Sequence, residues 1–574
     1  MMEQKIKTFT HSMRHPIKYL AFVVTMAAAI GLAGCDPGQP KGGSGDLKVS
    51  GFAKALTQKE FNALTPVQQY QVANKLYGTF FRGISAEDFF DLSAGTTTLV
   101  PLSSTFLTDT RKSLQTTLSN ADLLAVNGII EGFDEEGNPN ESDAKYEFDD
   151  DNDADENERA MQIPLARIKE YPISRDFYVQ WMSYFLSNTI MYSPAVEMET
   201  ADTLDAQNMY SFLTAQIKGK QTIRAMVRSN LPSLKRWRVS RSSENHALEA
   251  YELYLGLFET EEDSVKGGVA CKDFFLTDED SGYILSNSGI ENTEPQLILD
   301  TFFVTTCTDF YDVVSGHPLI IPRAVEVLVN YIYSGRSRDD RVEIINSITG
   351  SGVQTYEDVF TAMLFSKEYL LDTERPRSFE ENLLPLLDTL KWHPEAEPFD
   401  RVGRRIFENM VTDSNSNNRL YLGNKGWNNM TLKIGRLPDV PMDALSFANY
   451  HKGIREDLLT NEQSYDGSED GFPGLIYKGD GDDADENLRD VIAQMDLTDY
   501  VHFLFLNAMQ RKASAAELAA LITVFDDFNL LELDTNGVQV VRPSASNNRH
   551  NNIAEITFDY ISRLPEFYYF RSVN

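Results

Sequence analysis

The stretch TDYVHFLFLNAMQRKASAAELAALITVF, residues Thr498–Phe525, contains two helix-forming segments and the break between them. The apolar run ends at Arg511, and Ser514 then stands three residues before Glu517. A serine followed three residues later by a glutamate is a capping box, which satisfies the free backbone amides at the start of a helix. The stretch therefore predicts a helical hairpin, two helices joined by a short polar turn.

Three other stretches have the same arrangement of a long apolar helix, a polar break and a second capped helix. TPVQQYQVANKLYGTFFRGISAEDFFDL starts at Thr65, with Pro66 in the first turn, where proline is favoured. RAVEVLVNYIYSGRSRDDRVEIINSI carries Ser337 three residues before Asp340, and SRDFYVQWMSYFLSNTIMYSPAVEME is a more degenerate version. Internal duplication would explain the repetition, and so would a set of unrelated helical pairs, because capping serines are common.

Two of these units are followed by a further predicted amphipathic helix, Tyr356–Leu371 and Ile553–Phe570. Both end on a polar residue, a glutamate and an aromatic residue. The order helix, R-x-x-S-x-x-E, helix, then a helix ending near S-x-E-[FY], resembles helical modules of uncharacterised secreted bacterial families. These families include the C-terminal domains of planctomycete-type cytochrome-associated proteins.

The resemblance covers residues 498–570 best and residues 324–371 second. It implies an α-helical module with no agreed activity. In such modules the residues that correspond to Arg511, Ser514 and Glu517 look like capping and packing residues, so the resemblance implies no catalytic role for them.

An acidic phrase occurs twice, as DADENER at Asp153–Arg159 and as DADENLR at Asp483–Arg489. Each copy ends a polar stretch and leads into an amphipathic segment. Carboxylates at the start of a helix interact favourably with its dipole, by about 0.3–1 kcal/mol each. The repeat predicts equivalent junctions in two related halves, although an acid-rich composition also makes chance matches easier.

The N-terminus has the features of a bacterial lipoprotein signal. Four basic residues precede the apolar run AFVVTMAAAIGLAG, which is short for a membrane span and ends in Leu32-Ala33-Gly34-Cys35. This ending resembles a lipobox, and it predicts that Cys35 is lipidated and becomes the mature N-terminus; the alternative is a transmembrane anchor. The protein would then be anchored to a bacterial membrane, facing the periplasm or the exterior. Asp36 slightly favours the inner membrane.

The formal net charge of the 574 residues is −34. Removal of the leader, with four basic residues and one acidic residue, makes the charge more negative. Such a field repels nucleic acid and anionic lipid head groups. The predicted partners are therefore the membrane, through the lipid on Cys35, and another envelope protein or a glycan, with no nucleic acid.

The mature chain keeps two further cysteines, Cys271 and Cys307. Two cysteines in an oxidising compartment predict one disulfide. Two buried free thiols are the alternative. Neither cysteine lies in a C-x-x-C motif, so neither haem attachment nor thioredoxin-like chemistry is indicated.

The candidate metal site consists of alternating aspartates in the two acidic stretches. Hard oxygen donors at such spacing favour calcium. They are Asp149, Asp151, Asp153, Asp155, Asp480 and Asp482. An EF-hand loop that started at Asp149 would need glycine at position 154 and glutamate at position 160, and both are alanine. The two aspartate-rich stretches therefore form either a loose calcium site or solvated acidic loops. No other cofactor is predicted.

The sequence contains no nucleophile elbow, H-E-x-x-H, Walker loop or dinucleotide-binding glycine motif. The Gly- and Asn-rich stretch Leu420–Asp457 is typical of an ordered loop, where function concentrates. Its candidate residues for a ligand or partner surface are Trp427, Asn428, Asn429, Arg436 and Tyr450. Ordinary loop packing explains the same composition.

These observations predict a mainly α fold of helical hairpins, packed as bundles or as an irregular solenoid, with long acidic loops and minor β near GTTTLVPL and NGVQVVR. The expected segments are a signal peptide (1–34), a tether (35–50), an N-terminal helical unit (51–130), an acidic loop (131–160), a helical domain (161–315), a helical unit (316–415), a loop region (416–490) and a C-terminal helical unit (491–574).

The expected function is a lipid-anchored binding, scaffold or assembly protein of the cell envelope, because the composition favours a non-catalytic role over an enzyme. One alternative is a glycan- or peptide-processing enzyme whose carboxylates converge from distant segments. A second alternative is a calcium-responsive adhesion or assembly factor.

Overall fold

The computed structural model describes part of the chain. All the described residues belong to one compact unit, Lys48–Asn574. They are residues 51–84, 101–131, 167–187, 190–191, 203–232, 242–279, 282–377, 381–382, 384–385, 496–541 and 548–573.

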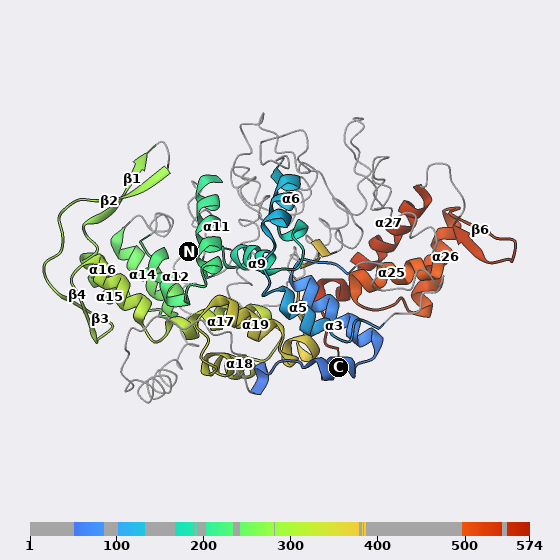
Figure 1. The fold of residues 1–574 in the computed structure, drawn as a ribbon, viewed down its shortest axis with the longest axis horizontal. Coiled ribbons are helices and arrows are strands. Elements are labelled where there is room, and N and C mark those ends of the chain that lie inside the picture. Colours follow the sequence, from blue (N-terminus) through green and yellow to red (C-terminus); the bar gives the residue numbers. More distant parts are fainter. Residues whose placement is uncertain are drawn as a thin grey trace, which may run out of the picture. The chain divides into compact units, whose positions relative to one another are not determined.

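Helix dominates, because 63% of these residues are helical, which confirms the predicted mainly α class. Figure 1 labels the elements. The N-terminal helices are η1 (Gly51–Ala53), α2 (Gln58–Asn62), α3 (Pro66–Thr79), α5 (Phe106–Ser113), α6 (Asn120–Glu131), α9 (Arg175–Ser187), α11 (Thr203–Lys218), α12 (Ile223–Asn230), α14 (Ser243–Leu255) and α15 (Glu261–Ala270).

Two further groups of helices follow. The middle group is α16 (Cys307–Gly316), α17 (Ile320–Ile332), α18 (Arg338–Gly350), α19 (Tyr356–Leu364) and the π-helical turn η4 (Glu368–Asp372). The C-terminal group is α25 (Leu497–Met509), α26 (Ala515–Asp527), α27 (Asn548–Ser562) and the 3₁₀ turn η7 (Pro565–Tyr568).

The strands are short and form two-stranded antiparallel sheets. The pairs are β1 (Phe274–Glu279) with β2 (Gly282–Asn287), β3 (Gln296–Ile298) with β4 (Phe302–Val304), β5 (Arg375–Pro376) with β8 (Tyr569–Phe570), and β6 (Leu531–Leu533) with β7 (Gln539–Val541). The predicted strand at NGVQVVR corresponds to β7, whereas most of GTTTLVPL lies outside the described residues. Strands β1–β4 fall within residues 161–315, where only helix was predicted.

The helices begin where the caps predict. Thr65 and Gln68 form a capping box at α3, with Pro66 in the first turn, and Ser514 and Glu517 form one at α26. The Ser337 side chain accepts a hydrogen bond from the Asp340 amide at α18. Helices α17 and α18 pack on each other as the predicted hairpin, whereas α25 and α26 both pack on α27.

The helices predicted at Tyr356–Leu371 and Ile553–Phe570 are shorter than expected. Helix α19 ends at Leu364 because the next backbone groups bond to the N-terminal segment: the Leu56 amide donates to the Phe365 carbonyl and the Lys367 amide to the Lys54 carbonyl. Helix α27 ends at Ser562, shortly before Pro565, whose ring cannot continue an α-helix. Long-range backbone bonds and a proline therefore override the apolar periodicity.

The buried core brings together segments that lie far apart in the sequence. The Trp181 indole on α9 is fully buried and donates to the Thr79 carbonyl at 2.9 Å. Its ring lies 5.3 Å from the Phe80 ring and 5.1 Å from the Phe360 ring. Aromatic contacts from three helical segments therefore centre on one indole.

Candidate functional site

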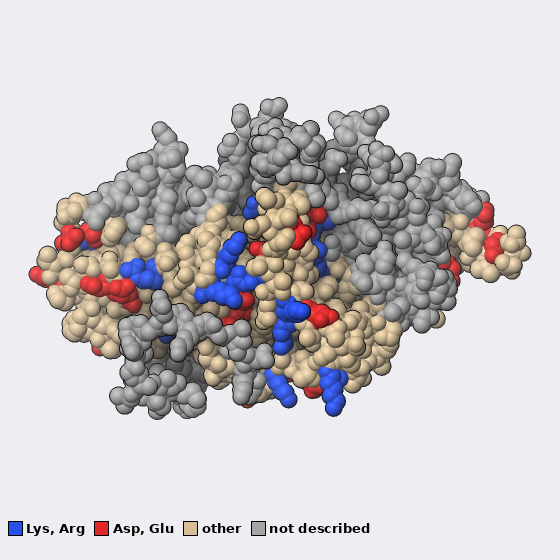
Figure 2. All heavy atoms as spheres, viewed as in Figure 1, with Lys and Arg blue, Asp and Glu red and all other residues tan. Residues whose placement is uncertain are grey.

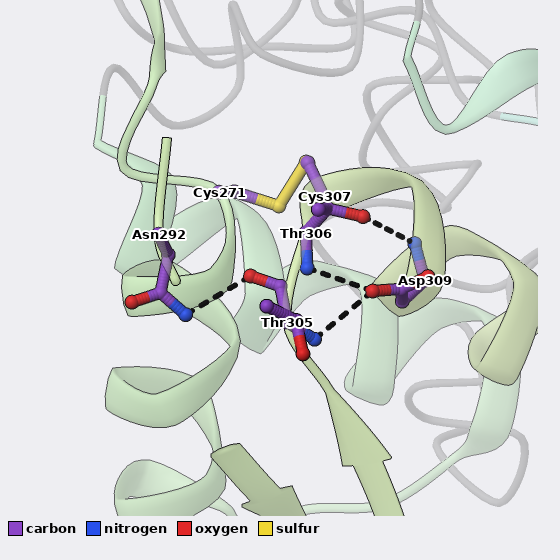
Figure 3. Close-up of a disulfide and its surroundings, with 6 residues drawn as sticks. All are labelled: Cys271, Asn292, Thr305, Thr306, Cys307 and Asp309. Atoms are coloured by element: carbon purple, nitrogen blue, oxygen red, sulfur yellow. Dashed lines mark hydrogen bonds between the residues drawn. A yellow bond between two sulfur atoms is a disulfide. The ribbon is translucent and has the colours of Figure 1, made fainter. Parts of the chain in front are cut away.

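A disulfide between Cys271 and Cys307 closes a loop that begins where α15 ends and returns at the first residue of α16 (Figure 3). Hydrogen bonds hold the end of this loop at the start of α16. The Thr306 hydroxyl accepts from the Asp309 amide at 3.2 Å, and the Asp309 carboxylate accepts from the Thr305 and Thr306 amides at 3.0 and 2.9 Å. These bonds with the backbone lower the pKa of Asp309. Asn292, inside the loop, donates to the Thr305 carbonyl at 2.9 Å.

The base of the loop is held by close packing of α14 on α15. A Cβ atom at Gly267 would lie 2.8 Å from the Ala247 Cβ, and one at Gly268 would lie 2.7 Å from the Glu244 Cα. Both distances are shorter than side chains tolerate, so only glycine lets the two backbones come this close. The two strands of the β3–β4 hairpin then pack on α15 and α16 respectively.

The β3–β4 hairpin has apolar side chains on both faces. Ile298 and Val304 point inward and are fully buried. Leu297 pairs directly with Phe303, so these two side chains share the opposite face, where they are 37% and 69% exposed. A hairpin with one face in water normally presents polar residues there. The exposed cross-strand pair of Leu297 and Phe303 is therefore an apolar surface on a hairpin that is held in place by its packing on α15 and α16.

This part of the chain carries further exposed apolar side chains and a marked excess of acid. Phe258, Val265 and Ile290 are 61%, 47% and 69% exposed. Residues 242–316 contain sixteen aspartates and glutamates, two lysines and no arginine. A partner that covered the Leu297–Phe303 pair would meet this negative field.

A second cluster of charges, at the start of α26, is centred on Arg511. The two guanidinium nitrogens Nη1 and Nη2 each donate to one oxygen of Glu517 at 2.8 Å. The Ser514 amide donates to Glu517 Oε2 at 2.8 Å, and Glu566 lies 3.6 Å from the guanidinium. Arg511 therefore ties the first turn of α26 to η7.

A similar cluster forms in the middle of the chain around Arg336. Its Nη2 lies 3.4 Å from Asp340, at the start of α18, and 2.6 Å from Glu368, the first residue of η4. In both clusters an arginine joins the acid of a serine-capped helix to a glutamate in the turn after the third helix.

Replacing Glu517 by glutamine gives a pH-dependent loss of stability. Hydrogen bonds from Arg511, followed by those from Ser514, lower the pKa of Glu517 from 4.5 to about 2. A folded-state pKa below the unfolded one stabilises the fold above about pH 4.5, and this contribution is lost as the pH falls towards 2. We expect Glu517→Gln to lower the unfolding free energy by about 1–2 kcal/mol at neutral pH. Urea unfolding should show the deficit shrinking as the pH falls below 4.5. A deficit of the same size at every pH would contradict this account.

A third group of charges is fully buried where β5 pairs with β8. Arg375 forms a two-point ion pair with Glu381, and the two side chains are 0% and 1% exposed. The guanidinium also faces the rings of Tyr331 and Phe570, at 5.0 and 4.8 Å. Burial opposes the charged form of Arg375, but the Glu381 carboxylate raises the pKa of Arg375 well above its ordinary value. The Arg375 guanidinium therefore stays charged inside the fold.

Lys75 on α3 lies in the same buried region. Its Nζ donates to the carbonyls of Thr373 and Arg571, the latter at 3.3 Å, and sits 5.1 Å from the Tyr369 ring. Burial, followed by the positive charge of Arg375, lowers the pKa of Lys75 well below its ordinary value. An amine with a lowered pKa can act as a nucleophile. Lys75 is fully buried, however, so a substrate has no access to it, and we assign it to structure.

The other predicted site residues lie outside the described part of the chain. They are the lipidation site Cys35, the aspartates Asp149, Asp151, Asp153, Asp155, Asp480 and Asp482, and the loop residues Trp427, Asn428, Asn429, Arg436 and Tyr450. Within the described residues, no cluster of three or more His, Cys, Asp or Glu side chains could hold a metal ion. In the same residues, no helix is long and apolar enough to cross a membrane.

No protein-family model, no curated protein and no solved structure matches this chain.

Proposed function

We propose that the protein is a lipid-anchored, non-catalytic binding protein of the bacterial cell envelope, and that the β3–β4 hairpin is where it holds a partner protein. The observation that carries this proposal is the Leu297–Phe303 pair, exposed on a framework held by a disulfide and by glycine-mediated helix packing. A rigid aromatic and aliphatic pair needs little ordering on binding, which favours affinity.

The charge around the hairpin indicates the kind of partner. Acidic residues Glu291, Glu294 and Asp300 are exposed in and beside the hairpin. A second copy of this chain would bring like charges together, and juxtaposed like charges cost several kcal/mol. The matching partner is a different protein, with an apolar patch surrounded by lysine and arginine.

The variant Leu297→Ser/Phe303→Ser tests this proposal. Phe303 is 69% exposed and Leu297 is 37% exposed, so we expect the unfolding free energy to fall by no more than about 0.5 kcal/mol for Phe303→Ser and about 1 kcal/mol for Leu297→Ser. The matched control is Leu533→Ser/Val538→Ser on the β6–β7 hairpin, where the side chains are 66% and 55% exposed.

Tagged full-length protein isolated from its own cells should bring down the same partner in the wild-type and control forms, and lose it in the Leu297→Ser/Phe303→Ser form. Unchanged recovery of the partner by that variant would refute the assignment of the hairpin. Self-association that depends on Phe303 would show that the partner is a second copy instead.

A further inference from the structure

His317 joins the end of α16 to strand β4 of the hairpin. Pro318 follows it in the sequence, and a residue before proline is held in an extended conformation. Helix α16 accordingly ends at Gly316, and His317 adopts φ −61° and ψ 141°. The His317 ring lies 5.8 Å from the ring of Phe302, the first residue of β4. The imidazole therefore packs against the strand that also carries Phe303.

A hydrogen bond favours the neutral form of the half-buried His317 imidazole. Its Nδ1 accepts from the Leu319 amide at 3.3 Å, so the neutral ring carries its proton on Nε2. A protonated imidazole has no acceptor, because both ring nitrogens then donate. Protonation of His317 would therefore break this bond and take the acceptor away from the Leu319 amide.

Arg224, on α12, already occupies the place where a positive charge at the end of α16 would be favoured. A cation near the end of a helix normally interacts well with the last carbonyls. Here Arg224 Nη1 donates to the carbonyls of Ser315 and His317, at 3.0 and 2.8 Å. An imidazolium at His317 would add a second positive charge beside this guanidinium. Burial, followed by the positive charge of Arg224, lowers the pKa of His317 below its ordinary value of 6.5.

The other charged groups on the elements around His317 are engaged or exposed. They are Arg228 and Asp312, which pair with each other, Arg323 and Glu326, which also pair, Asp309, which accepts from amides at the start of α16, and Asp300, exposed in the hairpin turn. Figure 2 shows further Asp and Glu over α15, on which β3 packs. Exposed carboxylates favour an imidazolium, but salt at physiological strength screens such charges beyond about 8 Å. Arg224 is therefore the charge that acts most strongly on His317.

We propose that His317 makes the β3–β4 hairpin sensitive to acid, so that the protein releases its partner when its surroundings become mildly acidic. This inference rests on the proposed partner-binding role of the hairpin. A protonated His317 loses its bond to Leu319 and is repelled by Arg224, so its ring moves away from Phe302. The next residue, Phe303, is then no longer held in place for the partner.

The direction of the effect follows from the pKa of His317. In the opened chain this imidazole protonates near its ordinary pKa of 6.5, whereas in the closed hairpin it protonates at a lower pH. The neutral ring therefore stabilises the closed hairpin fully above pH 6.5, and this contribution is lost as the pH falls from 6.5 through the lowered pKa. Carboxylates with ordinary pKa values near about 4 stay ionised down to about pH 5.5, so they do not produce the response.

The test measures amide hydrogen exchange of residues 296–304 in the full-length protein at about pH 7.5 and about pH 5.5, with each rate divided by the intrinsic rate of an unfolded peptide at that pH. We expect the wild-type hairpin to be at least about threefold less protected at the lower pH. His317→Asn should remove this response, because the asparagine oxygen can accept from Leu319 and gains no proton. The matched control is His502→Asn. His502, on α25, is also half-buried, and burial also lowers its pKa, but its replacement should leave the response of the hairpin unchanged.

Arg224→Gln gives a second arm. It keeps a donor for the carbonyls of Ser315 and His317 but removes the charge that repels the imidazolium, so we expect the response to acid to shrink. Each variant is compared with itself at the two pH values, so a general loss of stability does not imitate the response. Equal protection of the wild-type hairpin at both pH values, or an undiminished response in His317→Asn, would overturn the proposal.

Recovery of the partner at the same two pH values separates the acid response from the proposed function. We expect the wild type and His502→Asn to lose the partner at the lower pH, and His317→Asn to keep it. Loss from His317→Asn as well would place the acid sensitivity in the partner and overturn the role of His317. A partner that Leu297→Ser/Phe303→Ser retains at the higher pH would refute the hairpin as its binding surface, while the exchange rates would still decide whether His317 makes the hairpin sensitive to acid.

Discussion

Replacing Glu381 by alanine is expected to lower the unfolding free energy by about 3–5 kcal/mol, because it leaves the fully buried Arg375 without a counter-charge. Three aromatic rings, the Tyr369 hydroxyl at 3.0 Å and the Pro376 carbonyl at 2.9 Å remain around the guanidinium, but none of them carries a full negative charge. The measurement is urea unfolding at neutral pH. Because β5 pairs with β8, the loss should also loosen the C-terminal residues, and faster hydrogen exchange at Phe570 would report it.

The control for this prediction is Arg336→Ala. Arg336 also pairs with a glutamate, Glu368, but its side chain is 26% exposed. The substitution should cost about 1 kcal/mol or less. The double variant Arg375→Met/Glu381→Leu should recover much of the loss, because it removes both buried charges. A loss below about 1 kcal/mol for Glu381→Ala would show that Arg375 finds water or another carboxylate.

Replacing Cys271 and Cys307 by serine is expected to cost about 4 kcal/mol in the unit formed by α14–α16 and β1–β4. The cysteines are 36 residues apart, and opening a loop of this size gives the unfolded chain back its conformational freedom. Amide hydrogen exchange at Ile298 and Phe303 should become much faster. Partner binding should weaken as well, because the Leu297–Phe303 pair would no longer be held in place.

The internal control is the exchange of the α25–α27 amides, which should not change, because among the described elements these helices pack mainly on one another, on β7 and on η7. Exchange at Ile298 that stays at the wild-type rate would mean that the glycine-mediated packing of α14 on α15 holds the hairpin by itself.

Sequence patterns predicted the helix starts well because a cap is a local feature. Each capping side chain accepts a hydrogen bond from a backbone amide three residues later, as Thr65, Ser337 and Ser514 do. The local sequence therefore contains the whole signal. The helix ends were predicted less well. The end of α19 depends on backbone bonds to residues 54–56, about 300 positions earlier, which no local pattern reveals.

The β3–β4 hairpin escaped prediction because its turn lacks the usual residues. Leu299 and Asp300 both adopt positive φ angles, 48° and 55°. This conformation is normally signalled by Asn-Gly or Asp-Gly, and leucine rarely adopts it. A hydrogen bond from the Leu299 amide to Asp263, at 2.9 Å, helps to hold the turn on α15. A tertiary contact therefore replaces the local turn signal.

The buried ion pair was also not predicted. Arg375 and Glu381 stand in the polar stretch ERPRSFEEN, which looks like an exposed turn. Their burial depends on β8 and α17, from distant parts of the chain. By contrast, the likeness between the clusters around Arg511 and Arg336 follows the repeated serine-capped pattern that the sequence displays.

Photocrosslinking from the β3–β4 hairpin tests the proposed function most directly. A photoreactive phenylalanine analogue replaces Phe303 in the full-length protein in its own cells, and the same analogue at Val538 serves as the control. We expect one crosslinked partner from position 303, a different protein whose contact surface is apolar with basic residues around it, and none of this partner from position 538. No adduct at position 303, or an equal yield of the same adduct from both positions, would contradict the claim that the hairpin is the partner-binding surface.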